Sequence, residues 1–283
     1  MFRFWGHTVI FLYTDFGAEG PYLAQVQAVL AAESSGVPCF NLLSNAPAGD
    51  PRRAAYLLAG LAGALPSGAL VLGVVDPGVG GERLPIVVEA GGRRFVGPDN
   101  GLFSRVAARD CAARACRIDW RPARLSSSFH GRDLFAPVAA RLAAGVDMPL
   151  TEVPVSGLVG SDWPDELAEV VYADAYGNLF TGLRGDRVAD DAIVEAGGQR
   201  LHRARTFSAV PVGEAFWYRN SSGLVEIAVN GGSARERLGL GVGAIVRVSI
   251  CRAGLAPVHP FLSDRHSAAD AHDPLGHAVN TSL

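Results

Sequence analysis

The chain has 283 residues, a formal net charge of −3 and 49% hydrophobic residues. This length suits one large domain or two modest ones, and the apolar fraction is enough for a sizeable core. The weakly acidic balance gives no electrostatic reason to expect a nucleic-acid partner. All 25 basic residues are arginine. The absence of lysine excludes a Schiff-base lysine and the lysine of a phosphate-binding P-loop.

The cysteines and the apolar segments indicate a cytoplasmic protein. The four cysteines form no Cys-x-x-Cys pair; they are Cys39, Cys111, Cys116 and Cys251. We expect reduced thiols, with a Cys111–Cys116 disulfide as the less favoured alternative. The apolar run at residues 9–13 is too short for a signal peptide. No stretch approaches the roughly 20 apolar residues of a membrane span, so we expect no membrane attachment.

Strand and helix patterns alternate over the first 150 residues. Strands are predicted at residues 8–13, 38–43, 69–75, 85–90 and 94–97. Pro21 begins one helix, and Asp50 followed by Pro51 caps a second helix over residues 52–64. Gly91 and Gly92 predict a hairpin turn. This rhythm predicts an α/β fold with a mostly parallel sheet flanked by helices.

The pattern changes after residue 150. Short strands separated by Gly, Asn and Ser are predicted at 168–173, 192–196, 199–204, 214–219, 224–229 and 244–250. They favour a smaller, all-β, barrel-like domain. We therefore expect an N-terminal domain at 1–150, a linker at 151–166, a C-terminal domain at 167–251 and a disordered tail at 252–283. The tail contains His259, His266, His272 and His277, for which a metal site is the alternative.

The stretch from Val74 to Arg83 is the most informative in the sequence. An apolar strand runs into Asp76 and Pro77, and three glycines follow before Arg83. Ligands of open α/β sheets bind just beyond the carboxyl ends of strands. We therefore expect Asp76 and Arg83 to face one crevice. The alternative is a tight turn closed by a surface salt bridge.

His130 is the histidine whose context favours catalysis. It lies in Phe-His-Gly-Arg-Asp, just before a predicted helix that contains Pro137 and runs to Ala144. With Asp76 and Arg83 it supplies a trio that can position a water and manage its proton. Metal binding is the alternative, although a single histidine without a cysteine cluster makes a poor zinc site. The sequence has no Gly-x-Ser-x-Gly motif, so a hydrolytic serine is not expected.

Other polar residues follow predicted strands. Asp15 leaves the first strand, where a carboxylate can bind a ribose diol; the alternative is a helix N-cap. Asp174, Tyr176 and Asn178 follow the strand at 168–173. Tyr176 can stack on a base, and Asn178 offers a donor and an acceptor to an adenine edge. The alternative for this group is an Asn-containing hairpin turn.

Several motifs in chain order carry a resemblance to a known family. They are Thr-Asp-Phe-Gly at 14–17, Asp-Pro-Gly-Val-Gly at 76–80, Gly-Pro-Asp-Asn-Gly at 97–101, Ser-Phe-His-Gly-Arg-Asp at 128–133, Asp-Ala-Tyr-Gly-Asn at 174–178, Asn-Ser-Ser-Gly at 220–223 and Glu-Ile-Ala-Val-Asn at 226–230. From about residue 8 to about residue 250 the chain resembles the adenosine-forming S-adenosyl-L-methionine (SAM) hydrolases. This family, also called SAM hydroxide adenosyltransferases, is related to the nucleophilic fluorinases and chlorinases.

The resemblance implies an activity and its residues. Asp76, Arg83 and His130 match the family's water-handling triad. The matching substrate-binding positions are Asp15, Tyr22, Asp174, Tyr176, Asn178, Ser221, Ser222, Val229, Asn230 and Gly231. Among them, the resemblance assigns Asp15 to the ribose, and Asp174 and Ser221 to the methionine part. The implied reaction is the metal-independent hydrolysis of SAM to adenosine and L-methionine, with no cofactor. The implied assembly is a homotrimer with each site between the N-terminal domain of one subunit and the C-terminal domain of the next.

A SAM halogenase and a non-catalytic SAM- or adenosine-binding protein are the alternatives. The halogenases have a Tyr-Pro-Ala-Thr type of sequence at the Asp76 motif, a serine at the position of Gly131 and an extra loop. Asp76, Gly131 and the short Gly91–Gly92 turn therefore favour water over halide. The chain also departs from many family members at Gly20, at Ser44–Asn45 and at Gly182. The resemblance does not define the substrate contacts at those positions.

Overall fold

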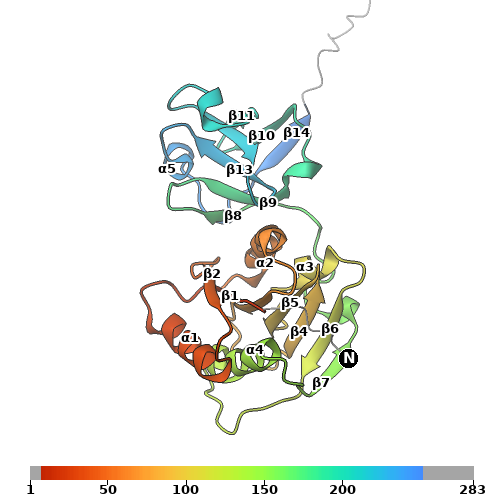
Figure 1. The fold of residues 1–283 in the computed structure, drawn as a ribbon. Coiled ribbons are helices and arrows are strands. Elements are labelled where there is room, and N and C mark those ends of the chain that lie inside the picture. The colour runs from red at the N-terminus through yellow and green to blue at the C-terminus, as the bar shows by residue number, and fades with distance from the viewer. Residues whose placement is uncertain (1–7, 251–283) are drawn as a thin grey trace, which may run out of the picture. The chain divides into compact units, whose positions relative to one another are not determined.

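A seven-stranded mixed sheet forms the first part of the protein (Figure 1). The computed structural model describes residues 8–250. The strand order is β2-β1-β3-β5-β4-β6-β7. The strands are β1 (Ile10–Thr14), β2 (Cys39–Leu43), β3 (Leu70–Val74), β4 (Pro85–Ala90), β5 (Arg93–Pro98), β6 (Arg114–Ile118) and β7 (Leu150–Val153). Strands β2, β1, β3 and β5 pair in parallel, and β4, β6 and β7 add antiparallel pairs. The predicted α/β class is confirmed.

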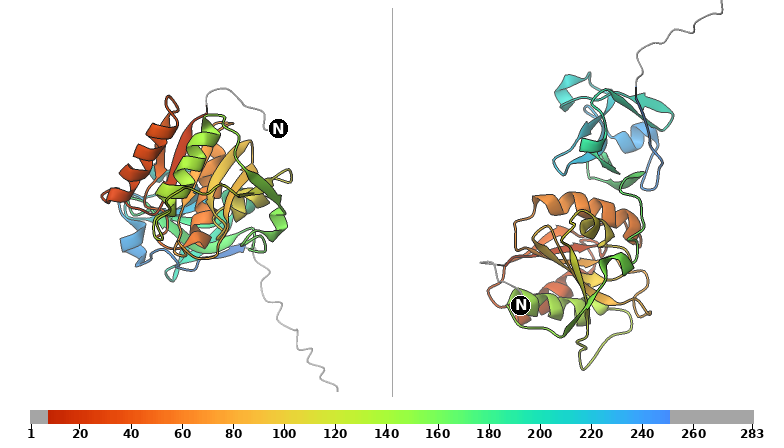
Figure 2. Two further views of the ribbon diagram at one scale, coloured as in Figure 1. Left: turned by 90° about the horizontal axis from the view of Figure 1, so that it is seen from below. Right: turned by 90° about the vertical axis from the view of Figure 1, so that its right-hand side faces the viewer.

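Helices cover both faces of this sheet (Figures 1 and 2). Ile10 and Leu12 of β1 belong to the same buried cluster as residues of α1 (Pro21–Glu33) and α4 (Ala136–Ala143). Tyr13 points to the opposite face, where α2 (Pro51–Leu61) and α3 (Ser104–Ala108) pack. Because successive strand residues alternate between faces, two covered faces require an almost continuous apolar run. This requirement explains the Val-Ile-Phe-Leu-Tyr sequence at 9–13.

Proline and capping residues begin two helices where the sequence predicts them. The Asp50 carboxylate accepts the Arg53 N–H at 3.0 Å, and Pro51 is the first residue of α2. Residues 62–64, predicted as the end of this helix, form a 3₁₀ turn. Helix α4 carries Pro137 in its first turn and follows a π-helical turn at Gly131–Phe135. His130 therefore lies at the start of a helical segment, as its motif predicts.

Two antiparallel sheets form the second part, which confirms the predicted change of fold class. One sheet has the order β12-β13-β9-β8 and the other has the order β11-β10-β14. The strands are β8 (Leu167–Ala173), β9 (Leu179–Arg184), β10 (Ala192–Ala196), β11 (Gln199–Leu201), β12 (Ala215–Arg219), β13 (Leu224–Val229) and β14 (Arg247–Ile250); α5 covers Ala234–Leu238. Strands β11 and β14 are shorter than predicted.

The sequence patterns missed three strands between residues 8 and 250. Strand β6 begins with an arginine, and β7 extends the first sheet to Val153, three residues past the expected end of the domain at 150. Strand β9 contains Gly182, which normally weakens a strand prediction. A Cβ atom at Gly182 would lie 2.6 Å from the Cβ of Leu167. Glycine is therefore needed here because β8 approaches the β9 backbone closely.

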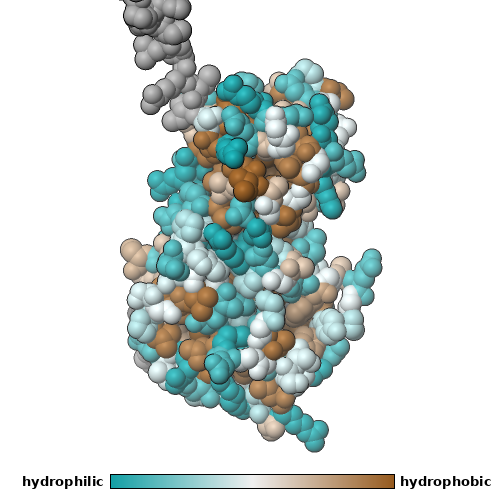
Figure 3. Space-filling view, turned by 180° about the vertical axis from the view of Figure 1, so that it is seen from behind, coloured by the Kyte–Doolittle hydropathy of each residue, from teal (hydrophilic) through white to brown (hydrophobic). Residues whose placement is uncertain are grey.

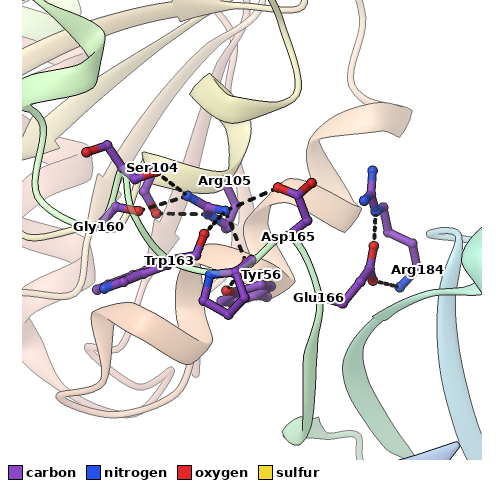
Figure 4. A network of polar contacts seen from close by, with 10 residues as sticks. Tyr56, Ser104, Arg105, Gly160, Trp163, Asp165, Glu166 and Arg184 are labelled. Atoms are coloured by element: carbon purple, nitrogen blue, oxygen red, sulfur yellow. Dashed lines mark hydrogen bonds and ion pairs between the residues drawn. The ribbon is translucent and has the colours of Figure 1, made fainter.

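Arg105 of α3 holds the connection between the two parts (Figure 4). Its side chain is 2% exposed. Its Nη1 donates to the carbonyls of Trp163 at 2.7 Å and Pro164 at 3.1 Å, and its Nη2 donates to the Gly160 carbonyl at 2.8 Å. The guanidinium lies over the Tyr56 ring, and the Tyr56 hydroxyl also donates to the Pro164 carbonyl. One buried cation thus satisfies carbonyls that the irregular connection leaves unpaired.

The N- and C-terminal ends lie outside the described residues. The predictions for Cys251, for the tail and for its histidines therefore stay untested. Cys39, Cys111 and Cys116 are free thiols. None of the helices between residues 8 and 250 combines the length and apolar character that a bilayer span requires. Figure 3 shows apolar patches separated by polar side chains on the face turned away in Figure 1.

We predict that Arg105→Met destabilises the protein by about 2–4 kcal/mol, because several buried carbonyls lose their donor. Thermal or urea unfolding measures this loss. Arg200→Met is the control, because the Arg200 side chain is 63% exposed and its replacement should change stability by no more than about 0.5 kcal/mol. Equal stability of the two variants would show that Arg105 does not hold the connection.

Candidate active site

Asp76 and Arg83 form a buried ion pair at the carboxyl end of β3. The Arg83 Nε donates to both carboxylate oxygens of Asp76 at 2.8 Å, and the Arg83 Nη2 also donates to Oδ2. The side chains of Asp76 and Arg83 are only 3% and 10% exposed. This degree of burial does not fit the alternative of a surface salt bridge. Asp76 lines a pocket, whereas Arg83 is not part of that lining and is joined to it through its hydrogen bonds to Asp76.

His130 joins this pair through a hydrogen bond that defines its protonation. The Arg83 Nη2 lies 3.0 Å from the His130 Nδ1. A guanidinium has only donors, so Nδ1 must accept and the ring proton resides on Nε2. Burial, followed by the positive charge of Arg83, lowers the pKa of His130. The imidazole is therefore neutral and presents an Nε2–H donor.

A glycine places the loop of the ion pair against the segment that leads to His130. Gly80 has φ = 81°, a left-handed conformation that favours glycine. A Cβ atom at this position would lie 2.5 Å from the carbonyl oxygen of Ser127. The loop between Asp76 and Arg83 thus approaches the backbone before His130 more closely than any larger residue allows.

The Gly-Pro-Asp-Asn-Gly motif supports the same strand end. The Asn100 Nδ2 donates to the Val75 carbonyl at 2.8 Å, directly before Asp76. A Cβ atom at Gly97 would lie 2.1 Å from the Gly73 carbonyl oxygen, so β5 can approach β3 here only with glycine. This motif therefore acts on the candidate site through the backbone.

Asp15 and two members of the trio line the same pocket. The pocket has a volume of about 130 Å³, and its lining includes Asp15, Asp76 and His130. The Asp15 Oδ2 accepts the Gly49 N–H at 2.8 Å. Helix α1 instead begins after Gly20 without a side-chain cap, so Asp15 is not its N-cap. Burial raises the pKa of the Asp15 carboxyl, whereas the Gly49 hydrogen bond lowers it.

Aromatic rings border this pocket. Phe16 and Phe129 belong to its lining and meet edge-on, with ring centroids 5.8 Å apart. Tyr22 lies 5.2 Å from Phe129 between centroids and is 50% exposed. A Cβ atom at Gly131 would lie 3.1 Å from the Cζ of Phe16. The predicted substrate residue Tyr22 is thus beside the pocket but is not part of its lining.

The second group of predicted substrate residues begins in the turn after β8. The Asp174 Oδ1 accepts the N–H groups of Tyr176 and Asn178 at 2.9 Å. The Asn178 Nδ2 donates to the Asp174 Oδ2 at 3.1 Å. Asn178 is buried, whereas Tyr176 is 80% exposed. The group forms the hairpin turn considered from the sequence, and this turn leaves the tyrosine ring accessible.

The remaining predicted residues lie near strand ends of the same sheet. Ser221 and Ser222 occupy the turn between β12 and β13. Val229 ends β13 and is buried, and Gly231 has φ = 69°. The Asn230 Nδ2 donates to the Val210 carbonyl at 2.7 Å. None of these residues lines the pocket around Asp76, whose lining comes from residues 15–131.

Among residues 8–250, no three His, Cys, Asp or Glu side chains gather in a way that could hold a metal ion. The trio of Asp76, Arg83 and His130 places an arginine where a divalent cation would need a ligand. A cation and two hydrogen-bonded partners instead suit a polar nucleophile such as water.

The comparisons with known proteins agree with these motifs. The model of the SAM hydroxide adenosyltransferase N-terminal domain matches residues 10–152. The model of the C-terminal domain of the same family matches residues 168–247. The chain belongs to the SAM hydroxide adenosyltransferase family. The resemblance stated from the sequence is thereby confirmed.

Relatives of this family match over most of their length. A Thermus thermophilus protein named (R)-S-adenosyl-L-methionine hydrolase is 40% identical over 258 residues, which cover 84% of this chain and 98% of the relative. A Salinispora arenicola protein of the same name is 37% identical over 257 residues, covering 83% and 95%.

Solved structures share the fold. A conserved hypothetical protein from Thermus thermophilus is 41% identical with a TM-score of 0.68, covering 86% of this chain and all 100% of that chain. An uncharacterized conserved protein from Thermotoga maritima is 28% identical with a TM-score of 0.76, covering 85% and 99%.

Several residues of the site were not selected from the sequence. Phe16 and Phe129 occur inside family motifs, whose polar residues were the ones predicted to act. Gly49 contributes a backbone N–H from a loop that carries no family motif, so no pattern pointed to it. Asn100 was predicted only as part of a motif. Its position just after β5 could have indicated that it belongs to the site, because polar residues at strand ends meet at one edge of a parallel sheet.

We predict that Arg83→Met raises the pKa of His130. The variant removes the positive charge beside Nδ1 and leaves the negative charge of Asp76 uncompensated. NMR titration of the imidazole should show a wild-type inflection below that of an ordinary histidine and an upward shift in the variant. His202 is exposed and serves as the internal control. An unchanged or lower pKa of His130 in the variant would contradict the hydrogen bond from Arg83.

Proposed function

We propose that this protein hydrolyses SAM to adenosine and L-methionine, with a water molecule as the nucleophile. The observation that supports this proposal best is the buried Asp76–Arg83–His130 cluster, whose members Asp76 and His130 line one pocket with Asp15. Membership of the family and the names of the relatives give the substrate. A site built from an acid, a cation and a neutral imidazole suits the activation of water.

The reaction balances without a cofactor. The water oxygen forms a bond to C5′ of the adenosyl group while the C5′–S bond breaks, and the sulfur keeps the bonding electrons. The positive sulfonium becomes the neutral thioether of methionine, and one proton is released from the water. Because charge is lost when the nucleophile is hydroxide-like, exclusion of bulk water favours this step.

Each member of the cluster has its own role in this proposal. The Nε2–H of His130 donates to the water oxygen, since Nδ1 is occupied by Arg83. Asp76 accepts a hydrogen bond from the water and receives its proton, because the carboxylate keeps lone pairs beyond those used by Arg83. The guanidinium stabilises the developing hydroxide through its charge. Asp15 binds the ribose hydroxyl groups at the same pocket.

Positioning supplies more of the rate than proton transfer does. A general base typically contributes a factor of about 10²–10⁴, or about 3–5 kcal/mol. Holding the two reactants in line contributes roughly 7–11 kcal/mol. The rigid attachment of the cluster therefore matters as much as its chemistry. Asn100 and Gly80 provide this attachment through the backbone.

We predict that the purified protein forms equimolar adenosine and L-methionine from SAM. Activity should persist after EDTA treatment, because the proposed mechanism uses no metal. Chromatography of reactions in chloride and fluoride buffers identifies the product. A 5′-halogenated adenosine as the main product would favour the halogenase, and SAM binding without turnover would favour the non-catalytic protein. Loss of activity in EDTA that a divalent ion restores would overturn the metal-independent mechanism.

Substitutions should separate nucleophile handling from substrate binding. Arg83→Met and His130→Ala should lower kcat by at least about 10²-fold and change the SAM dissociation constant little. Asp15→Ala should instead weaken the binding of SAM and adenosine, because both contain the ribose. Stopped assays and calorimetry measure the two effects. Normal adenosine binding by Asp15→Ala would remove Asp15 from the ribose site.

The complete site requires both parts of the chain, which we place in domains at 1–150 and 167–251. The pocket lining ends at residue 131, whereas the expected substrate residues other than Asp15 and Tyr22 lie between 174 and 231. Arg105 restrains the connection between these sets. We propose a cyclic homotrimer in which the C-terminal domain of a neighbour completes each site. Such a ring is a head-to-tail interface that closes.

Inactive subunits of such a trimer should complement each other. His130→Ala disables the N-terminal half-site, and Asn178→Ala removes the amide that bonds to Asp174. After subunit exchange at equal amounts, about a quarter of the sites should contain two intact halves if subunits mix at random. Activity of the mixture and its mass in light scattering test this arrangement. A fully active monomer, or no recovery despite proven exchange, would contradict it.

A further inference from the structure

Glu226 is a buried carboxylate that the proposed reaction does not use. It lies on β13 and is 2% exposed. Its Oε1 accepts the Tyr218 hydroxyl at 2.5 Å, and its Oε2 accepts the Asn220 Nδ2 at 2.9 Å. Burial raises the pKa of Glu226, and these two hydrogen bonds lower it. The carboxylate thus connects one strand residue with one turn residue.

Asn220 shapes the turn that contains the two serines. Its Oδ1 accepts the N–H groups of Ser222 at 2.9 Å and Leu224 at 3.0 Å. Its backbone carbonyl accepts the Gly223 N–H at 3.0 Å. Because both bonds to Oδ1 depend on the orientation of one amide, rotation of the Asn220 side chain would break them together. The hydrogen bond to Glu226 opposes that rotation, since it holds the Nδ2 end of the amide.

The fold of the hairpin does not itself require this carboxylate. Tyr218 and Glu226 are cross-strand neighbours, and the ladder between β12 and β13 already continues from Ala215 to Arg219. Apolar side chains usually fill such fully buried positions. The feature specific to glutamate is that it offers two acceptors to two donors. A glutamine would keep both contacts only if the Tyr218 hydroxyl turned to accept from its NH₂ group.

The serine turn is accessible. Ser221 is exposed and Ser222 is half-buried. Within residues 8–250, neither hydroxyl has a hydrogen-bond partner. Asp174 lies near enough to Glu226 for their charges to interact.

We infer that Glu226 is a positioning residue for substrate binding: it fixes Asn220, and Asn220 presents Ser221 and Ser222 to the methionine portion of SAM. This inference rests on the proposed function and adds to it a residue that touches no substrate. It separates two kinds of binding determinant. Asp15 acts on the adenosine portion, whereas the Glu226–Asn220 pair acts only on the amino-acid portion.

A swap of the two polar groups tests the inference. Glu226→Leu removes both acceptors, and it is preferred to glutamine because the Tyr218 hydroxyl can accept from an amide NH₂. Asn220→Asp alone places two carboxylates against each other. The double variant is Glu226→Gln with Asn220→Asp. In the double variant, the NH₂ of the introduced glutamine donates to the introduced aspartate, and its oxygen accepts from Tyr218. The second aspartate oxygen accepts the N–H groups of Ser222 and Leu224. The double variant keeps the net charge and restores every hydrogen bond.

Each single variant should raise the KM for SAM by about tenfold or more and leave kcat within about twofold, because loss of a hydrogen bond to a charged group acts on binding. The double variant should return KM to within about threefold of the wild-type value. Calorimetry should give the same adenosine affinity for all four proteins. Glu195→Gln, on β10 of the other sheet, is the control and should change none of these values.

Other outcomes would overturn the inference. A merely structural role predicts that the single variants weaken adenosine binding as much as SAM binding and lower the Tm in parallel. Failure of the double variant to restore KM, despite a normal Tm, would show that Glu226 does not act through Asn220. If the wild-type protein neither binds nor converts SAM, the proposed function fails and this inference fails with it.

Discussion

The in-register pairing of β1 with β3 is the constraint on which the site depends. Thr14 pairs with Val74, so the two parallel strands end at the same level. Asp15 and Asp76 follow these ends within two residues and line one pocket. A slip of one residue would turn the apolar side chains of either strand to the wrong face of the sheet. The buried core on both faces therefore fixes the spacing of two carboxylates that carry the proposed chemistry.

Asp15 and Asp76 are like charges that lie near each other and are partly buried, so they need a compensating cation. Arg83 supplies it, and its hydrogen bonds to Asp76 and His130 make the three side chains one unit. Removal of one member of a buried ion pair leaves an uncompensated charge, which typically costs about 3–5 kcal/mol. The same arrangement keeps His130 neutral. The electrostatic role of Arg83 therefore cannot be separated from its structural role.

In the C-terminal part, too, hydrogen-bonded polar side chains position exposed groups. Asp174 organises one turn through backbone N–H groups, and Asn220 organises another. Short polar side chains can replace regular secondary structure at such turns because they bond to the nearby backbone. These turns expose Tyr176 and Ser221, whereas Asp174 and Asn220, which organise the turns, are held by hydrogen bonds. In both parts of the protein, accessible groups are thus supported by hydrogen-bonded neighbours that are less exposed.

The sequence alone determined the fold class, the order of the main elements and the members of the trio. Apolar runs ending in Asp15 and Asp76 placed these carboxylates at strand ends, where ligands bind, and the glycine-rich stretch and the Phe-His-Gly-Arg-Asp motif pointed to Arg83 and His130. It did not reveal β9, where Gly182 hides the strand pattern. Only the tertiary structure decided that Gly49 bonds to Asp15, that Asn100 holds Val75 and that Arg83 selects the tautomer of His130. These contacts join residues 25 to 47 positions apart, and no local pattern encodes them, because strand pairing and loop packing alone bring such distant residues together.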